Sequence, residues 1–279
     1  MNLEFLKMHG LGNDFVIFDM RSKWHDLSAI QIRNIADRHL GVGCDQMVML
    51  SQPQQDGDVF MHIYNADGGE VGACGNVTRC VGYLLLKEAA DKQQVAIETV
   101  EGILFADRTG DTMQITVNMG QPRFDAENIP MQGGLDHKQI DLAIADLPPA
   151  IAVGVGNPHC VFFVDDAEAI DIEKHGPIVE HANEFPERTN VEFVSVETPS
   201  RLRMRVWERG AGVTQACGTG ACATLVAAVV RGLSERQADI ILDGGVLNIA
   251  WDAETNDIMM TGPVAFVYQG VIDLDNFSD

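Results

Sequence analysis

Two short stretches of this sequence place a cysteine beside glycine and small polar residues, just ahead of an apolar run. The first holds Cys74 in Ala-Cys-Gly-Asn-Val-Thr-Arg-Cys, residues 73–80, and the second holds Cys217 in Ala-Cys-Gly-Thr-Gly-Ala-Cys, residues 216–222. Each pattern predicts a helix that begins immediately after the cysteine. A helix start favours an anion, so we expect both thiols to ionise more readily than a free cysteine, with a pKa of about 3.5–7.5.

Two matched thiols could invert the configuration of a tetrahedral carbon. One thiolate would remove a proton from one face, and the opposite thiol would return a proton to the other face. The carbanion formed in between adds charge to a neighbouring carboxylate, which must be held strongly. Backbone N–H groups at the two predicted helix starts, Gly75-Asn76 and Gly218-Thr219, are suitable anion sites.

The other four cysteines are interpreted as buried, small apolar residues, which is what free cysteines usually are. These are Cys44, Cys80, Cys160 and Cys222. The sequence contains no Cys-x-x-Cys pair, so we expect no metal site and no disulfide framework. The same apolar interpretation is disfavoured for Cys74 and Cys217, because both precede a predicted helix in the same way.

Composition limits the class of partner. The 279 residues are enough for about two domains, and 46% of them are hydrophobic. The balance of 19 Lys and Arg against 41 Asp and Glu gives a net charge of −22, which argues against nucleic acid or an anionic membrane as partner and favours a small molecule. Neither a signal peptide nor a membrane-spanning apolar run is apparent, so we expect a cytoplasmic protein with reduced thiols.

The apolar patterns predict an α+β fold. Ser28 is a plausible N-cap for a helix over residues 28–39, and residues 125–149 are expected to form an irregular connection. The final strand, near residues 264–274, could cross back to the first half. Further strands are predicted at 3–7, 15–19, 47–50, 59–64, 95–99, 103–107, 113–117 and 191–194.

The two cysteine stretches belong to a repeat that spans most of the chain. Cys217 lies 217 − 74 = 143 residues after Cys74, and the same offset relates Tyr64 to Trp207. An offset of 144 relates Gly12-Asn13 to Gly156-Asn157, and Gln46 to Asn190. Chance recurrence of small residues explains single matches but not their shared order, so we infer two halves of one fold related by duplication.

Ionisable residues appear in the second half where the repeat breaks. Glu208 stands opposite Asn65, Arg209 opposite Ala66, and His159 opposite Phe15. Glu208 suits an ammonium group and Arg209 a second, distant carboxylate. The alternatives are a solvated surface ion pair for Glu208 and Arg209, and a hydrogen-bonded core histidine for His159.

These blocks together resemble diaminopimelate epimerases. The resemblance rests on His9-Gly-Leu-Gly-Asn13-Asp-Phe15, Asn65-Ala-Asp-Gly68, Ala73-Cys-Gly-Asn76, Gly156-Asn-Pro-His159, Glu208-Arg-Gly210 and Ala216-Cys-Gly-Thr-Gly220. It implies a cofactor-independent enzyme that interconverts LL- and meso-2,6-diaminopimelate in lysine and peptidoglycan precursor synthesis. It also implies two domains that close over the substrate, and often a homodimer.

The resemblance assigns roles to residues of this chain. Cys74 and Cys217 are the acid/base pair, and His159 and Glu208 tune the thiols. The implied substrate contacts are Asn13, Gln46, Asn65, Gly75, Asn76, Asn157, Asn190, Glu208, Arg209, Gly218 and Thr219. One departure is Val77, where many members have glycine, and a side chain there could narrow the helix entry beside Asn76.

We therefore expect two pseudo-symmetric, strand-rich domains, each wrapped around a central helix, with the active site in the cleft between them. The expected domains are residues 1–118, onto which residues 265–279 pack back, and residues 119–264. Two other functions stay open: a related two-thiol racemase acting on proline or hydroxyproline, and a duplicated amino-acid-binding protein without catalysis. Oxidation could join Cys74 to Cys217 in a disulfide and inactivate the enzyme.

Overall fold

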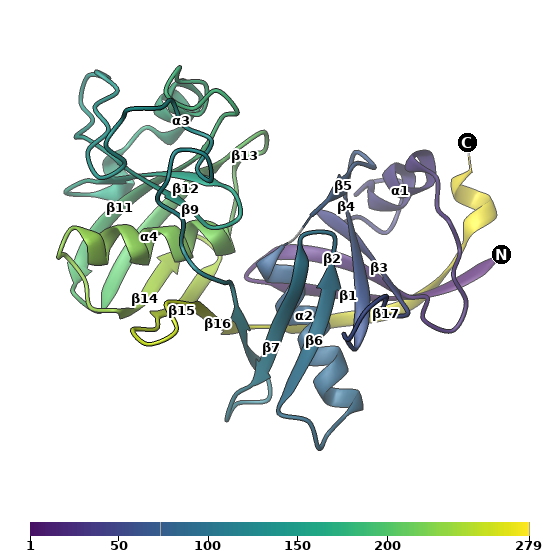
Figure 1. Cartoon of the computed structure of the whole chain (residues 1–279). Helices are drawn as coiled ribbons and strands as arrows, with labels where there is room; N and C mark the ends of the chain where they lie inside the picture. The colour runs from purple at the N-terminus through teal and green to yellow at the C-terminus, as the bar shows by residue number, and fades with distance from the viewer. Residues whose placement is uncertain (73, 279) are drawn as a thin grey trace. The chain divides into compact units, whose positions relative to one another are not determined.

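The computed structural model describes residues 1–72 and 74–278, which form two compact units (Figure 1). The N-terminal unit comprises residues 1–117 and 262–279, and the C-terminal unit comprises residues 118–261. The α+β class is confirmed in both, because each unit is a strand-rich sheet with few helices.

The N-terminal unit is built on a mixed sheet. Strand β2 pairs antiparallel with β1 and parallel with β3, β4 pairs antiparallel with β3 and β5 and parallel with β6, and β6 pairs antiparallel with β7. The elements are β1 (Asn2–Gly10), β2 (Asn13–Asp19), α1 (Ala29–Ala36), β3 (Gln46–Ser51), β4 (Val59–Asn65), β5 (Glu70–Val71), α2 (Gly75–Glu88), β6 (Gln94–Thr99), β7 (Gly102–Arg108), β8 (Gln114–Asn118), β17 (Ala265–Asp273) and the 3-10 helix η2 (Leu274–Phe277).

The C-terminal unit repeats this order and the sense of the six pairings just given. Strand β10 pairs antiparallel with β9 and parallel with β11, β12 pairs antiparallel with β11 and β13 and parallel with β14, and β15 pairs antiparallel with β14 and β16. The elements are β9 (Ile151–Gly154), β10 (Pro158–Phe163), the 3-10 helix η1 (Ala167–Ala169), α3 (Ile172–Glu180), β11 (Asn190–Thr198), β12 (Arg201–Glu208), β13 (Gly212–Val213), α4 (Gly218–Val230), β14 (Gln237–Leu242), β15 (Gly245–Trp251) and β16 (Ile258–Pro263).

The residue pairs between neighbouring strands show the repeat at the level of single residues. Phe15 pairs with Gln46 between β2 and β3, and His159 pairs with Asn190 between β10 and β11. Both positions differ by the offset of 144 found in the sequence. The hairpins β6–β7 and β14–β15 each turn at a glycine with positive φ, Gly102 at 124° and Gly245 at 142°. The two units therefore have one topology and one register.

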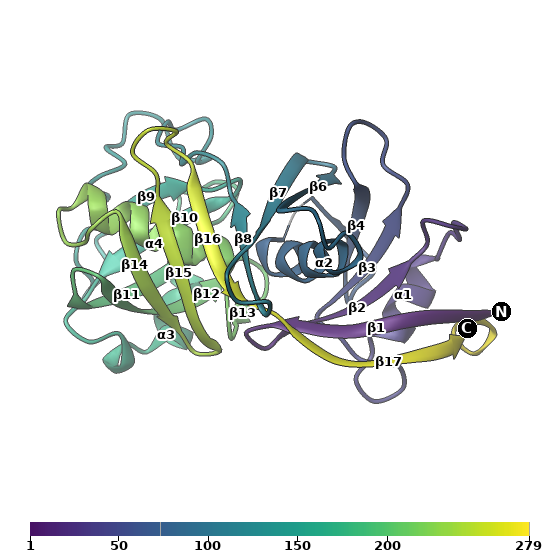
Figure 2. The same cartoon turned by 90° about the horizontal axis from the view of Figure 1, so that it is seen from below.

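The central helices α2 and α4 are buried in their own units. Ten of the 14 residues of α2 and ten of the 13 residues of α4 are buried. Helix α2 packs against β1, β6 and β7, and α4 against β9, β10, β11, β14 and β15 (Figure 2). Helices α1 and α3 contribute to separate apolar clusters on other strand faces, through Ile32 and Ile35, and through Ile172 and Val179.

Most predicted elements are present, with two differences at helices. Ser28 caps α1 as expected, but the helix ends at Ala36 because the Asp37 carboxylate accepts hydrogen bonds from the N–H groups of His39 and Leu40. Helix α3 was not predicted, because Gly176 and Pro177 in its sequence look like helix breakers.

The connection 125–149 contains no regular helix or strand, as expected, and its backbone forms only an isolated bridge from Ile140 to Ala150. Strand β17 crosses back as predicted and pairs antiparallel with β1 over its length (Figure 2).

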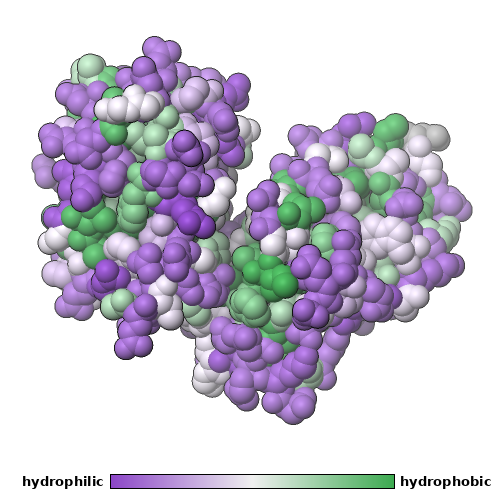
Figure 3. Space-filling model, in the orientation of Figure 1, coloured by the Kyte–Doolittle hydropathy of each residue, from purple (hydrophilic) through white to green (hydrophobic). Residues whose placement is uncertain are grey.

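The face drawn in Figure 3 is mostly hydrophilic, with small separate hydrophobic patches. This agrees with the acidic composition. No helix in residues 1–72 and 74–278 is long and apolar enough to cross a membrane. Within the same residues, no group of three or more His, Cys, Asp and Glu side chains could hold a metal ion.

Candidate active site

Both motif cysteines occupy the N-cap position of a central helix. Cys74 precedes α2 with φ −148° and ψ 114°, and Cys217 precedes α4 with φ −106° and ψ 110°. The predicted helix starts at Gly75 and Gly218 are confirmed, so the first-turn N–H groups follow each thiol directly. Ala73, which opens the first motif, lies outside the described residues.

In the N-terminal unit, Asn13 and Asn76 lie beside Cys74. The Asn13 side-chain oxygen accepts a hydrogen bond from Asn76 Nδ2 at 3.1 Å and lies 4.0 Å from the Cys74 sulfur. Gln46 and Asn65 form a second pair, with Gln46 Nε2 donating to Asn65 Oδ1 at 3.1 Å. We call Asn13, Gln46, Asn65, Cys74, Gly75 and Asn76 the Cys74 half-site.

An ion-pair network holds the side chain of Asn13 in place. Asn13 Nδ2 donates to Asp45 at 3.0 Å, and Arg38 bridges Asp45 and Asp14 with contacts of 2.7 Å to each. The buried Lys7 lies 2.6 Å from Asp14. Hydrogen bonds and charge from Arg38 and Lys7 outweigh the effect of burial and lower the pKa of Asp14 to about 2. The sequence analysis named none of these supporting residues.

In the C-terminal unit, His159 and Asn157 contact each other, and Asn190 makes two hydrogen bonds of its own. His159 Nε2 is 2.8 Å from Asn157 Oδ1, and Asn190 Nδ2 donates to the carbonyl of Pro158 at 2.9 Å. Asn190 Oδ1 accepts from the backbone N–H of Arg209, also at 2.9 Å. Asn190 thus holds the start of β10 beside the end of β12. We call Asn157, His159, Asn190, Glu208, Arg209, Cys217, Gly218 and Thr219 the Cys217 half-site.

The expected low pKa of Cys217 is wrong. Its sulfur accepts a hydrogen bond from the Gly220 N–H at 3.3 Å and lies 3.5 Å from Thr219 Oγ1. Both contacts favour the thiolate, but the side chain is almost fully buried. Burial, together with the nearby carboxylate of Glu208, raises the pKa of Cys217 well above its ordinary value. Cys217 is therefore a thiol at neutral pH.

Glu208 and Arg209 occupy different surroundings although they are neighbours in sequence. Glu208 accepts a hydrogen bond from the Thr214 hydroxyl, and its charge acts on Cys217. Arg209 is exposed, and its guanidinium donates to the Glu187 carbonyl at 3.1 Å. Glu208 thus contacts Thr214, whereas Arg209 contacts the backbone at Glu187.

The remaining cysteines are buried, as predicted. Burial raises the pKa values of Cys44 and Cys80 to about 12 and that of Cys160 well above its ordinary value. None of the six cysteines forms a disulfide bond within the described residues. Val77, where the resemblance breaks, is fully buried, so its side chain packs inside the N-terminal unit.

Glu192 is a functional candidate that the sequence analysis missed. It lies on β11 with no exposed surface, and its Oε1 atom is 2.6 Å from His159 Nδ1. Burial raises its pKa. The signal was present in the sequence, since Glu192 is the single ionisable residue in the predicted apolar strand 191–194.

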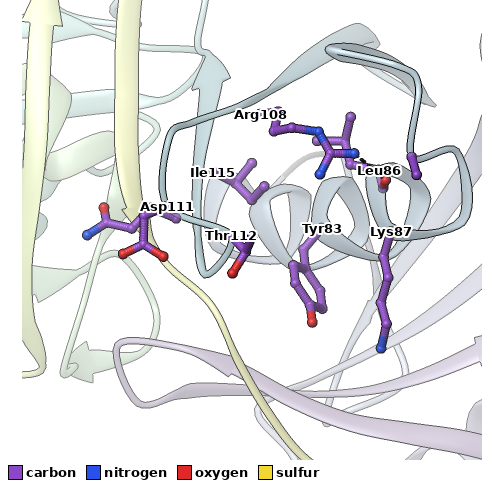
Figure 4. A pocket seen from close by; sticks show the side chains of 9 residues that line it. Tyr83, Leu86, Lys87, Arg108, Asp111, Thr112 and Ile115 are labelled. Atoms are coloured by element: carbon purple, nitrogen blue, oxygen red, sulfur yellow. Dashed lines mark hydrogen bonds between the residues drawn. The ribbon is translucent and has the colours of Figure 1, made fainter.

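A cavity of about 210 Å³ lies elsewhere in the N-terminal unit, at the C-terminal end of α2 (Figure 4). Tyr83, Lys87, Arg108 and Ile115 contribute to its lining, and Arg108 donates to the Leu86 carbonyl there. Cys74 stands at the opposite end of this 14-residue helix, about 20 Å away by the rise of an α-helix. None of the predicted site residues lines this cavity.

Comparison with known proteins places the chain in a family. The family model described as diaminopimelate epimerase matches residues 5–124 and 151–267. The diaminopimelate epimerase of Rhodospirillum centenum is 50% identical over 267 residues, 95% of this chain and 91% of that protein. The enzyme of the same name from Erythrobacter litoralis is 46% identical over the full length of both chains.

Solved structures share the fold at low sequence identity. A phenazine biosynthesis protein of the PhzF family from Bacillus anthracis matches with a TM-score of 0.69 and 16% identity, covering 98% of this chain and 99% of that one. A hydroxyproline epimerase from Agrobacterium vitis, with bound trans-4-hydroxy-L-proline, matches with a TM-score of 0.68 and 15% identity, covering 97% and 91%. These likenesses concern the fold, whereas the family model and the close relatives decide the family: the chain belongs to the diaminopimelate epimerases.

Proposed function

We propose that this protein is a cofactor-independent epimerase that interconverts LL- and meso-2,6-diaminopimelate, in lysine and peptidoglycan precursor biosynthesis. The observation that carries the proposal is the matched position of Cys74 and Cys217. Each thiol is the N-cap of the central helix in a unit of the same topology. The relatives named diaminopimelate epimerase support the choice of substrate.

The proposed mechanism uses the two half-sites on one α-carbon. Because Cys217 keeps its proton, it begins one direction of the reaction as the acid, and Cys74 begins as the thiolate base. Cys74 takes the α-proton, and the electron pair of the broken C–H bond stays on the substrate as a carbanion. Cys217 then delivers its proton to the other face, which leaves a thiol at Cys74 and a thiolate at Cys217. The reverse reaction exchanges these roles.

Polar groups of both half-sites would bind the substrate. The N–H groups at the starts of α2 and α4 suit the carboxylate next to the reacting carbon, where negative charge develops. The side-chain amides of Asn13, Gln46, Asn65, Asn76, Asn157 and Asn190 supply further hydrogen bonds. Glu208 suits the α-ammonium group, and the exposed Arg209 suits the distal carboxylate.

Exchange of the α-proton with solvent tests the reaction directly. Reduced protein is incubated in deuterium oxide with diaminopimelate, without pyridoxal phosphate, and mass spectrometry follows deuterium at the α-carbon. We expect incorporation together with interconversion of the two isomers. A protein that binds diaminopimelate without any exchange would instead be an amino-acid-binding protein. A panel including proline and hydroxyproline tests the racemase alternative.

Arg209 distinguishes diaminopimelate from substrates without a distal charged group. Replacement by alanine removes the partner of the second carboxylate, so Arg209→Ala should raise KM for diaminopimelate by about tenfold to a hundredfold, the loss of one charge-assisted hydrogen bond. Arg201→Ala is the control, because Arg201 pairs with Glu197 at the surface. Equal KM values for both variants would favour the proline-type racemase.

A cytoplasmic location and a homodimer are part of the same proposal. A cytoplasm keeps cysteines reduced, which a thiol acid and base require. Sedimentation velocity over a range of protein concentrations tests the dimer. Inactivation by oxidant, followed by peptide mapping for a link between Cys74 and Cys217, tests the proposed redox sensitivity.

A further inference from the structure

The two units differ in polarity at an equivalent pair of buried positions on neighbouring strands. In the C-terminal unit His159 and Glu192 contact each other across β10 and β11. The residues at the same places in the N-terminal unit, 144 positions earlier, are Phe15 and Val48. All four are fully buried. An apolar pair therefore fits this place in the fold, and the polar pair needs another explanation.

The polar pair connects the interior of the C-terminal unit to Asn157, a residue predicted to bind the substrate. Glu192 Oε1 lies 2.6 Å from His159 Nδ1, and His159 Nε2 lies 2.8 Å from Asn157 Oδ1. The carboxyl group also reaches the first turn of α4, since a Cβ added at Gly220 would stand 2.9 Å from Glu192 Oε1. Asn157 is partly exposed, and its Nδ2 group has no hydrogen-bond partner among the described residues.

Hydrogen-bond chemistry fixes the direction of this chain. An amide oxygen only accepts, so His159 Nε2 must carry a proton and donate it to Asn157 Oδ1. Nδ1 then either accepts a hydrogen bond from a protonated Glu192 or donates a hydrogen bond to an ionised Glu192. The second oxygen, Glu192 Oε2, is buried without a hydrogen-bond partner, which is costly for a charged carboxylate and tolerable for a neutral acid. The neutral arrangement is favoured, with Glu192 as donor.

We propose that Glu192 is a positioning residue of the Cys217 half-site. As a buried neutral acid it donates to His159 Nδ1, neutral His159 donates to Asn157 Oδ1, and the N–H groups of Asn157 are left to donate to the substrate. This inference rests on the proposed function for the identity of the substrate, but the hydrogen-bond chain itself is a property of the protein alone.

Nitrogen-15 NMR of histidine-labelled protein tests the chain without any substrate. The resonances of His159 are identified among the eight histidines by their absence from the double variant His159→Phe/Glu192→Val. We expect a neutral ring protonated at Nε2 in the wild type, and the same tautomer in Glu192→Gln, whose amide N–H can replace the acid proton. In Glu192→Val the Nδ1 atom loses its donor, so its resonance should shift away from the wild-type position. A wild-type ring protonated on both nitrogens would overturn the proposal.

Kinetics with diaminopimelate test the effect on Asn157. Glu192→Gln keeps a donor to Nδ1 and should keep KM within about twofold of the wild type, whereas Glu192→Val should raise KM about tenfold, the effect of one hydrogen bond. The double variant restores the apolar packing of the N-terminal unit, so it should fold even if Glu192→Val does not, and it should share the raised KM. A double variant with wild-type KM would contradict the positioning role.

The two measurements separate this inference from the proposed function. A wild-type protein without epimerase activity would remove the proposed substrate and leave the NMR result to decide on the hydrogen-bond chain. An active wild type whose KM rises equally in Glu192→Gln and Glu192→Val would keep the function and overturn the role of Glu192.

Discussion

Cys217 shows two opposing influences on one thiol. The start of α4 favours the thiolate, but a helix terminus contributes typically 0.3–1 kcal/mol and up to about 2 kcal/mol. Full burial can shift a pKa by as much as about 3–5 units, each unit being about 1.4 kcal/mol, and the carboxylate of Glu208 acts in the same direction. Burial therefore outweighs the helix start, and Cys217 retains its proton.

Removal of the Glu208 carboxylate should make Cys217 more acidic. Glu208→Gln eliminates a negative charge that disfavours the thiolate, while the amide oxygen can still accept from Thr214. The pKa of Cys217 should fall, and alkylation of its peptide by iodoacetamide at a fixed alkaline pH should become faster. Glu197→Gln, at an exposed surface pair, is the control. Unchanged or slower alkylation of Cys217 in Glu208→Gln would contradict the assigned cause.

The sequence could predict the positions of these residues but not their surroundings. Cys74 and Cys217 were found because their residue types, their neighbours and a shared offset all mark a helix start. The pKa of Cys217 depends on its burial and on Glu208, which stands at the end of β12, and nothing local to residues 216–222 carries that information. His159 was found through the repeat, whereas its partner was overlooked inside an apolar strand.

At the level of secondary structure, a polar network holds Asn13 in place, with Lys7 on β1, Asp14 on β2 and Asp45 just before β3. Asp14 has a pKa of about 2 in the folded protein against 3.8 ordinarily, so it stabilises the fold at neutral pH by roughly 2 kcal/mol. This contribution is present above about pH 4 and is lost as the pH falls through about 2.

Asp14→Asn should therefore lower the free energy of unfolding by about 2 kcal/mol at pH 7, and the difference from wild type should shrink as the pH falls from 4 to 2. Urea denaturation at a series of pH values measures this difference in the free energy of unfolding. The control is Asp275→Asn, an exposed residue beside the N-terminus. A difference that stays constant down to pH 2 would mean that Asp14 acts through something other than its charge.

The first turn of α4 packs too closely for any side chain at Gly220. A Cβ there would lie 2.9 Å from Glu192 Oε1 and 3.3 Å from the Cys217 sulfur. Gly220→Ala should cost about 1–3 kcal/mol of unfolding free energy by overpacking, despite the better helix propensity of alanine, and should slow turnover by displacing Cys217. Gly133→Ala is the control, since no atom lies within 4 Å of its added Cβ. Equal stabilities for the two variants would show that Glu192 moves aside freely.

Strands and helix starts were largely predictable because their patterns are local. The end of α1 was not, because the side chain of Asp37 stops the helix three residues before the apolar pattern does. Helix α3 was missed for the opposite reason: packing against β11, β12 and β13 holds a helix whose own sequence contains Gly176 and Pro177. Tertiary contacts overrode local propensity in both cases.

At the scale of the whole molecule, the chain enters and leaves the C-terminal unit at adjacent points. Within that unit the Met119 N–H donates to the Ile258 carbonyl at 2.8 Å, and Asn118 Nδ2 donates to Asp257 at 2.9 Å. The N-terminal unit is discontinuous and is completed by β17, which pairs with β1. The C-terminal unit is thus a continuous segment with its own core, inserted between β8 and β17.

Such a segment should fold alone. Residues 118–261, produced as a separate protein, are expected to unfold cooperatively in urea and to protect the amide hydrogens of β11 and β12 from exchange. The isolated unit retains Cys217 but lacks Cys74, so it should catalyse no exchange of the α-proton of diaminopimelate. Full-length Cys74→Ala is the matched control, because it removes the same thiol from an intact fold and should be equally inactive. Unprotected amide hydrogens in the segment would show that the two units fold only as one cooperative structure. Exchange of the α-proton catalysed by the segment alone would contradict the need for two thiols.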